Sequence, residues 1–73
     1  MIEVIDKATT FNIYDENNLL ISSMYCRRYT AYWEFECLSS KYPNKSLKLI
    51  RREDNKELIV STPSGIHYQN HRI

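Results

Sequence analysis

Glycine is almost absent from this chain of 73 residues, in which Gly65 is the only example. Phosphate-binding loops such as GxGxxG and the P-loop need several closely spaced glycines, because the backbone there must approach the ligand without interfering side chains. The single glycine therefore excludes both motifs. Proline is also scarce, with two residues, which argues against a loop-rich scaffold.

Cysteine and long apolar runs are scarce as well. Cys26 and Cys37 are the only two cysteines, a number that favours free thiols in a reducing compartment. Glu3, Asp6 and Lys7 interrupt the start of the chain, where no apolar run reaches the roughly 7–15 residues of a signal peptide. No stretch approaches the roughly 18 residues of a membrane span. We therefore expect a cytoplasmic protein that does not enter a membrane.

The chain also has almost no net charge, since its formal charge at neutral pH is only +1. The distribution is uneven, since residues 1–25 hold four acids against one base and residues 26–56 hold eight bases against four acids. We expect residues 1–73 to form a single domain. A chain this short buries only about 60% of its unfolded surface, so a second copy or a partner would stabilise it.

The most regular segment that is present covers residues 31–42. Apolar residues recur there at spacings of four, three and four, which predicts an amphipathic helix with one buried stripe. The stripe consists of Ala31, Phe35, Leu38 and Tyr42. We expect Thr30 to cap the first turn and Pro43 to end the helix. Trp33, the only tryptophan, falls almost opposite the stripe, so it is either covered by another segment or exposed for a partner.

Alternating apolar and polar residues predict a β-hairpin on each side of this helix. The first joins strands over residues 9–14 and 19–25, and the second joins strands over residues 47–52 and 57–62. Asp, Glu and Asn fill the first four-residue turn and, together with Lys56, the second, and Asp and Asn can bond their own backbone there. An alternative helix start near Ser23 is disfavoured by the strand character of the residues before it.

The loop lengths predict which residues oppose each other. They place Ile13 opposite Leu20 in the first hairpin and Ile50 opposite Ile59 in the second. At the chain ends, residues 1–8 contain a short candidate edge strand. Residues 64–73 have no clear period and form a tail that is either mobile or docked.

The result is a small two-layer α+β domain of ββαββ order, in which one helix packs on one face of an antiparallel sheet of two hairpins. The expected covered face of the sheet consists of Phe11, Ile13, Leu20, Met24, Leu47, Leu49, Leu58 and Val60. The expected uncovered face consists of Asn12, Tyr14, Leu19, Ile21, Lys48, Ile50, Arg52, Glu57 and Ile59. Apolar residues on an open face indicate a cover: one of the termini, a second copy or a foreign partner.

Catalytic and metal-binding patterns are weak. The acidic residues lie mostly in turns, where solvated carboxylates are usual, so we expect neither an enzyme nor a cofactor. Cys26, Cys37, His67 and His71 can be combined into a zinc site only with unusual spacing. We therefore expect no metal site.

Protein binding is the function that the composition favours most. Six tyrosines and one tryptophan are many for 73 residues, and these residue types dominate interface hot spots. The predicted partner-binding residues are Trp33, Tyr14, Tyr25, Ile21, Ile50 and Ile59.

Two alternatives remain. One is direct nucleic-acid binding, because bases are clustered near aromatic residues that can stack on nucleobases. Its predicted residues are Arg27, Arg28, Lys48, Arg51 and Arg52. The other is a homodimeric structural protein that associates through the open sheet face or an edge strand.

In size and general style, the chain resembles the short single-domain proteins of phages and mobile elements. The resemblance implies an inhibitor, of anti-defence or anti-CRISPR-like type, that docks on a host complex handling nucleic acid.

Overall fold

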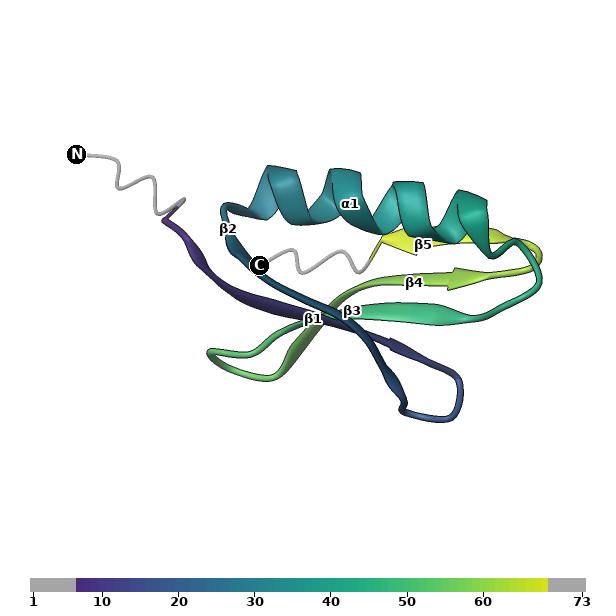
Figure 1. Ribbon diagram of the computed structural model, residues 1–73, viewed down its shortest axis with the longest axis horizontal. Coiled ribbons are helices and arrows are strands. Elements are labelled where there is room, and N and C mark those ends of the chain that lie inside the picture. The colour runs from purple at the N-terminus through teal and green to yellow at the C-terminus, as the bar shows by residue number, and fades with distance from the viewer. Residues whose placement is uncertain (1–6, 69–73) are drawn as a thin grey trace.

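Five strands and one helix make up residues 7–68, the part of the chain that the computed structural model describes (Figure 1). The elements are β1 (Thr9–Asp15), β2 (Leu20–Cys26), α1 (Arg28–Lys41), β3 (Leu47–Arg51), β4 (Lys56–Thr62) and β5 (Gly65–Tyr68). The predicted α+β architecture of two hairpins and one helix is confirmed. The fifth strand lies in the segment expected to be a tail without regular structure.

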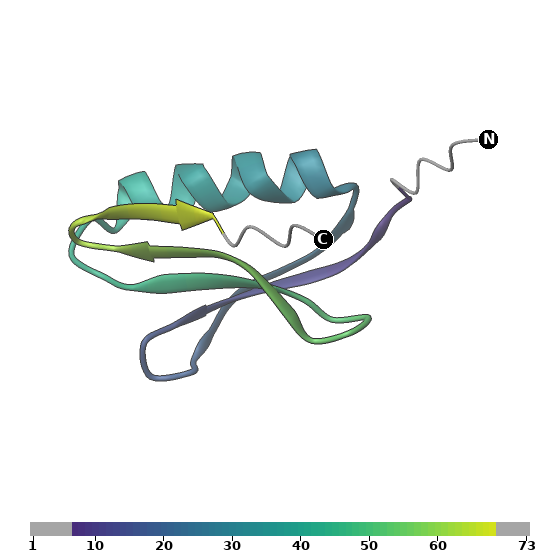
Figure 2. The ribbon, with the colours of Figure 1, turned by 180° about the vertical axis from the view of Figure 1, so that it is seen from behind.

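All strands belong to one antiparallel sheet in the order β2-β1-β3-β4-β5. The helix joins β2 to β3 and covers one face of the sheet, and both views show it running beside β5 (Figures 1 and 2). Among the described residues, β2 and β5 are the two edges. The candidate edge strand in residues 1–8 falls largely outside the described residues.

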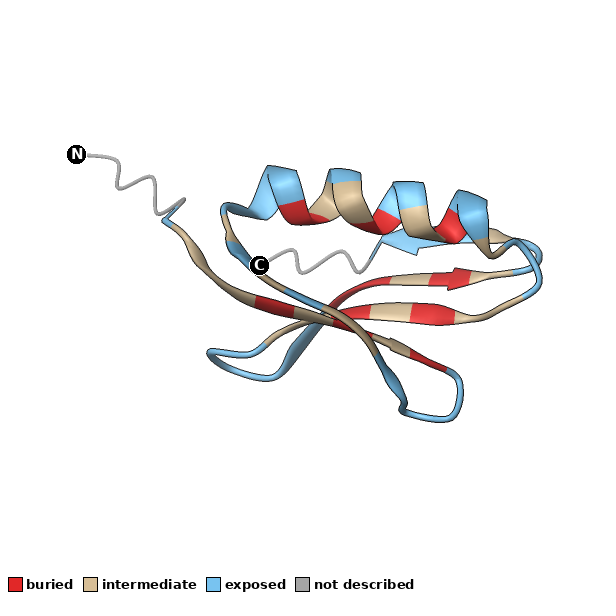
Figure 3. Ribbon diagram, in the orientation of Figure 1, coloured by how far each residue is buried: buried red, intermediate tan, exposed pale blue. Residues whose placement is uncertain are grey.

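The core lies between α1 and the sheet face beneath it (Figure 3). Its apolar members are Phe11, Ile13, Ala31, Phe35, Leu47, Leu49, Leu58 and Ile59. Ile21, Met24, Cys26, Tyr32 and Leu38 pack at its border and are partly buried. The strands thus alternate between core and surface as their period of two requires, except at two bulges.

The helix begins earlier than predicted. Arg27 is the N-cap, in extended conformation, and its carbonyl accepts the N–H groups of Thr30 and Ala31. The expected Thr30 cap is therefore wrong, because β2 ends at Cys26 and the chain turns directly into the helix. The last helical residue is Lys41, two positions before Pro43, which agrees with the predicted end.

A bulge in the first hairpin corrects the predicted register. Ile13 pairs with Ser22 and Tyr14 with Leu20, so Ile21 is an extra residue on β2. The bulge directs Ile21 toward the core border, whereas Leu20 is 51% exposed. The predicted pairing of Ile13 with Leu20 and the burial of Leu20 are therefore wrong.

A second bulge lies between β3 and β4. Leu49 pairs with Ile59 and Ile50 with Glu57, so Leu58 is the extra residue. Leu58 and Ile59 both enter the core, and Val60 is only partly buried. The predicted pairing of Ile50 with Ile59 is wrong, because inserting one residue exchanges the two faces of a strand.

Asp15 fixes the turn of the first hairpin. Its carboxylate accepts the backbone N–H groups of Asn17 (2.8 Å) and Leu19 (3.0 Å), and Lys45 Nζ lies 3.8 Å from Oδ2. Asn18 adopts φ 63°, a left-handed conformation that asparagine tolerates well. The Leu19 N–H group, more than the Lys45 charge, lowers the pKa of Asp15.

This lowered pKa predicts acid sensitivity. A group whose folded pKa lies below its unfolded value, near 3.8 for Asp15, stabilises the fold above that pH, and the contribution disappears as pH falls through the folded pKa. We expect Asp15→Asn to destabilise the protein at neutral pH. The variant should also lose less stability than the wild type as the pH falls below about 4, and urea unfolding at a series of pH values measures both effects. Asp54→Asn should also reduce the acid-induced loss of stability, because Arg51 lowers the pKa of Asp54 to about 2, and solvent around this surface pair screens the effect. Parallel stability curves for wild type and Asp15→Asn would contradict this role.

Candidate functional site: an aromatic flank of the helix

Two large aromatic side chains stand exposed on α1 one turn apart. Tyr29 is 67% exposed and Trp33 is 64% exposed. With Tyr32 and Glu36 they occupy about 100° of the helix circumference, which extends from partly buried Tyr32 at the edge of the core to Trp33 on the far side of the helix. Trp33 thus lies off the buried stripe, where the sequence placed it.

The strand β5 extends this side of the helix. The ring of Tyr68 packs against that of Tyr32, with centroids 5.9 Å apart and planes inclined by 47°. The Tyr68 hydroxyl donates a hydrogen bond to Oε2 of Glu36. This bond, together with burial, raises the pKa of Tyr68, so the hydroxyl remains a donor at neutral pH.

These side chains form one surface, which we call the aromatic flank. It consists of Tyr29, Tyr32, Trp33, Glu36 and Tyr68. Its rings offer π faces, and its carboxylate retains acceptor capacity while it binds Tyr68. Aromatic faces beside a carboxylate attract cationic side chains through cation–π and charge-assisted contacts.

A groove of about 280 Å³ lies between the C-terminal half of α1 and the β4–β5 hairpin. Its lining residues are Ser39, Ser40, Pro43, Ser61, Thr62, Pro63, Ser64, Gly65 and Ile66. None of these side chains titrates near neutral pH, so the groove offers hydroxyl groups and apolar surface rather than acid–base chemistry. Ile66, 38% exposed, lies two residues before Tyr68 on β5 and connects the groove with the aromatic flank.

The sheet face opposite α1 is more polar than predicted. The Ser23 hydroxyl donates to Oδ1 of Asn12 (2.7 Å), and Asn12 Nδ2 donates to the Tyr14 hydroxyl (3.2 Å). Tyr14 and Ile50 are half-buried there, while Tyr25 is 74% exposed near the β2 edge. The network ties Tyr14 to its neighbours, which reduces its freedom to reach a partner.

Two predicted partner-binding residues do not lie on this face. Ile59 is fully buried in the core, and Ile21 packs at the core border. Their assignment to the uncovered face was wrong, because neither bulge could be foreseen from alternation alone. The remaining predicted residues, Trp33, Tyr14, Tyr25 and Ile50, divide between the aromatic flank and the open face.

The predicted nucleic-acid residues are dispersed. Arg27 and Arg28 lie exposed at the start of α1, whereas Lys48 lies on the open sheet face. Arg51 binds Asp54 through two hydrogen bonds of 3.0 and 2.8 Å, which lower the pKa of Asp54 to about 2. These residues thus lie at the start of α1, along β3 and in the turn after β3, and nucleic-acid binding remains a prediction for a salt titration to test.

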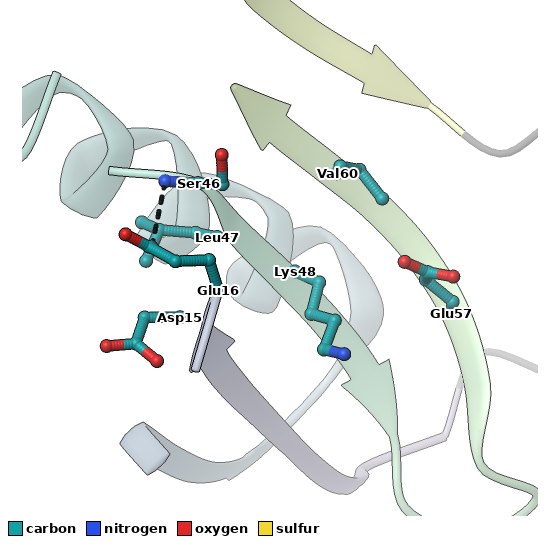
Figure 4. A pocket seen from close by; sticks show the side chains of 7 residues that line it. All are labelled: Asp15, Glu16, Ser46, Leu47, Lys48, Glu57 and Val60. Carbon is teal, nitrogen blue, oxygen red and sulfur yellow. Dashed lines mark hydrogen bonds between the residues drawn. The ribbon is translucent and has the colours of Figure 1, made fainter. Parts of the chain in front are cut away.

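A small hollow of about 80 Å³ lies near Lys48 (Figure 4). Lys48 of β3 and Glu57 and Val60 of β4 line it, together with the end of β1. Glu16 closes one side by accepting the backbone N–H of Ser46 at 3.2 Å. The hollow is far below the roughly 300 Å³ of an ordinary small-molecule site.

The cysteines and histidines are spread over the fold. Cys26 lies on β2 at one sheet edge and His67 on β5 at the other, while Cys37 is exposed on α1. Burial raises the pKa of the Cys26 thiol, with a further contribution from nearby Glu34. Within residues 7–68 no group of three or more His, Cys, Asp or Glu side chains is placed to hold a metal ion. His71 lies outside the described residues.

Comparison with protein families, curated proteins and solved structures finds no significant match. In the described part of the chain, no helix has the length and apolar character needed to cross a membrane. The sequence pointed to Trp33 but missed Tyr68 and Glu36. Their contact arises from β5, and residues 64–73 carry no alternation that would have revealed a strand.

Proposed function

We propose that this protein is a non-catalytic binding module that docks a protein partner on the aromatic flank. The observation that carries the proposal is the exposure of Trp33 and Tyr29 on adjacent turns. Tryptophan and tyrosine provide large contact areas at low entropic cost and dominate interface hot spots. Tyr68 and Tyr32 extend the same surface onto β5.

The flank favours a partner that presents an arginine or lysine side chain. Glu36 sits among the rings of Tyr32 and Tyr68, and its carboxylate can accept a charge-assisted hydrogen bond. A guanidinium group can stack on the neighbouring Trp33 ring at the same time.

A narrower role follows from this chemistry. Proteins that handle nucleic acid expose grooves rich in arginine and lysine, because they bind phosphates. A small domain with aromatic rings around a carboxylate can occupy such side chains without catalysis. We therefore retain the proposal of an inhibitor that docks on a host complex handling nucleic acid, as an anti-defence protein would.

The test is partner capture from the native cell or infected host with four matched variants. Trp33→Ala and Tyr29→Ala each remove an exposed ring from the aromatic flank. Tyr14→Ala and Tyr25→Ala each remove a ring from the opposite side of the sheet. We expect capture to fall at least roughly tenfold for the Trp33 variant, a usual hot-spot effect, and to persist for the Tyr25 variant. Glu36→Gln should weaken capture if the partner contributes a cation.

The outcomes separate the surfaces. Loss of capture only with the Tyr14 and Tyr25 variants would show that the partner binds the open sheet face instead. Unchanged capture in all four folded variants would show that the partner binds neither surface. Circular dichroism of each variant ensures that lost capture does not reflect lost folding.

A further inference from the structure

Within residues 7–68, the strand β2 is an open sheet edge with unusual composition. Its seven residues, Leu20–Cys26, include no charged residue and no proline, although natural proteins commonly use lysine, proline or a bulge to block such edges. The bulge at Ile21 affects only the end next to the turn, and Ser22–Cys26 pair with β1 in one regular register. Five residues of this edge are therefore regular and unprotected by charge.

The backbone direction of β2 follows from its neighbours. The N–H of Arg52 donates to the carbonyl of Thr10, so Thr10 directs its backbone groups toward β3. Because the groups alternate along a strand, Phe11 and Ile13 direct theirs toward β2, where Met24 and Ser22 oppose them. Ser23 and Tyr25 must then point their N–H and C=O groups away from the sheet.

We infer that two copies of this chain associate through antiparallel pairing of β2 with β2. A twofold axis at Met24 places Ser23 of one copy opposite Tyr25 of the other, so their outward groups can exchange four backbone hydrogen bonds. The pairing sets the large Tyr25 ring beside the small Ser23 side chain. It joins the two sheets into one sheet of ten strands and buries part of the exposed Tyr25.

Charge complementarity favours a second copy over a foreign strand. The turn before β2 carries exposed Glu16, and β2 is followed directly by exposed Arg27 and Arg28. Antiparallel pairing brings the acidic end of each strand beside the basic end of the other, and the symmetry repeats this contact twice. The β2 edge is thus complementary to the β2 edge of a second copy in backbone hydrogen bonding, in side-chain size and in charge.

This association leaves the aromatic flank free. Tyr32 and Glu36 face β5, the opposite edge from β2. The dimer therefore presents two flanks, and its formation does not depend on the proposed protein-binding function.

The first test is the mass in solution by light scattering, with concentrations up to roughly 1 mM. We expect the mass to rise from monomer toward dimer. An Arg27→Glu/Arg28→Glu variant should raise the dimer dissociation constant roughly tenfold, because it reverses the charge at both ends of the interface. Both arginines are exposed, so the fold should persist.

A charge-swap mixture tests whether the second strand comes from another copy. Glu16→Lys leaves one copy with basic residues at both ends of β2, and Arg27→Glu/Arg28→Glu leaves the other copy with acidic residues at both ends. We expect each variant alone to associate poorly and an equimolar mixture to form a heterodimer. A wild-type mass that stays monomeric throughout the series would overturn the inference, as would a mixture that associates no better than its components.

A cross-link tests the register. Opposed residues that do not exchange backbone hydrogen bonds have Cα atoms about 4.5 Å apart, within disulfide range. With Cys26 and Cys37 replaced by serine, Met24→Cys should form an intermolecular disulfide under mild oxidation. His67→Cys, on the other edge strand, is the matched control. Equal cross-linking at both positions would contradict the proposed pairing.

Discussion

Phe35→Ala is expected to lower the free energy of unfolding by about 3–5 kcal/mol. Phe35 is fully buried at the centre of α1 and packs in the single apolar core between helix and sheet. The substitution removes apolar contacts and leaves a cavity that one short helix cannot close. A domain of this size has a total stability of roughly 4–11 kcal/mol, so the variant should be close to unfolding.

Urea unfolding followed by circular dichroism measures this loss. Tyr29→Ala is the matched control, because it removes an aromatic ring from the same helix at a position that is 67% exposed. We expect that control to change stability by no more than about 0.5 kcal/mol. A Phe35→Ala cost below about 1 kcal/mol would show that α1 does not close the core as described.

Ile59→Ala is expected to cost about 2–5 kcal/mol, whereas Ile50→Ala should cost much less. The two residues are identical in type and lie on neighbouring strands. Ile59 is fully buried, and Ile50 is half-buried on the open face. The bulge at Leu58 creates this difference, because it turns Ile59 toward the helix.

Val60→Ala completes the test of the bulge. Without the extra residue, Val60 would face the helix and Ile59 would face solvent. We expect Val60→Ala to cost clearly less than Ile59→Ala in the same urea experiments, since Val60 is only partly buried. A larger cost for Val60→Ala than for Ile59→Ala would contradict the bulge and support the regular pairing that the loop lengths predicted.

Much of the fold could be predicted from periodicity. The spacing of Ala31 and Phe35 identified the buried side of the helix, and the polar turns located both hairpins. These signals are local, so one sequence is enough to detect them. The order of the elements followed from the same patterns.

The bulges and the fifth strand could not be predicted in that way. A bulge depends on how two strands fit against a shared core, and an alternating pattern carries no sign of it. The strand β5 has only four residues and forms because β4 offers a free edge. Both effects are tertiary, and they changed the candidate site by placing Ile59 in the core and Ile21 at its border, and by adding Tyr68.

The two edges of the sheet thus have different proposed roles. The β5 edge supports the aromatic flank through Tyr68, and the β2 edge supports self-association through Ser23 and Tyr25. A dimer with two free flanks could engage a partner that has repeated basic sites, with the gain in avidity that two linked contacts give. The two roles can be removed separately by substitution.

The emission of Trp33 is the most direct test of the docking surface. Trp33 is the only tryptophan and is 64% exposed, so its fluorescence reports on the flank alone. When a captured protein that has no tryptophan, or one whose own tryptophans have been replaced by phenylalanine, is added, we predict a blue shift and protection from iodide quenching. Tyr25→Ala should retain both changes. Full binding with unchanged Trp33 emission and quenching would contradict docking on the aromatic flank.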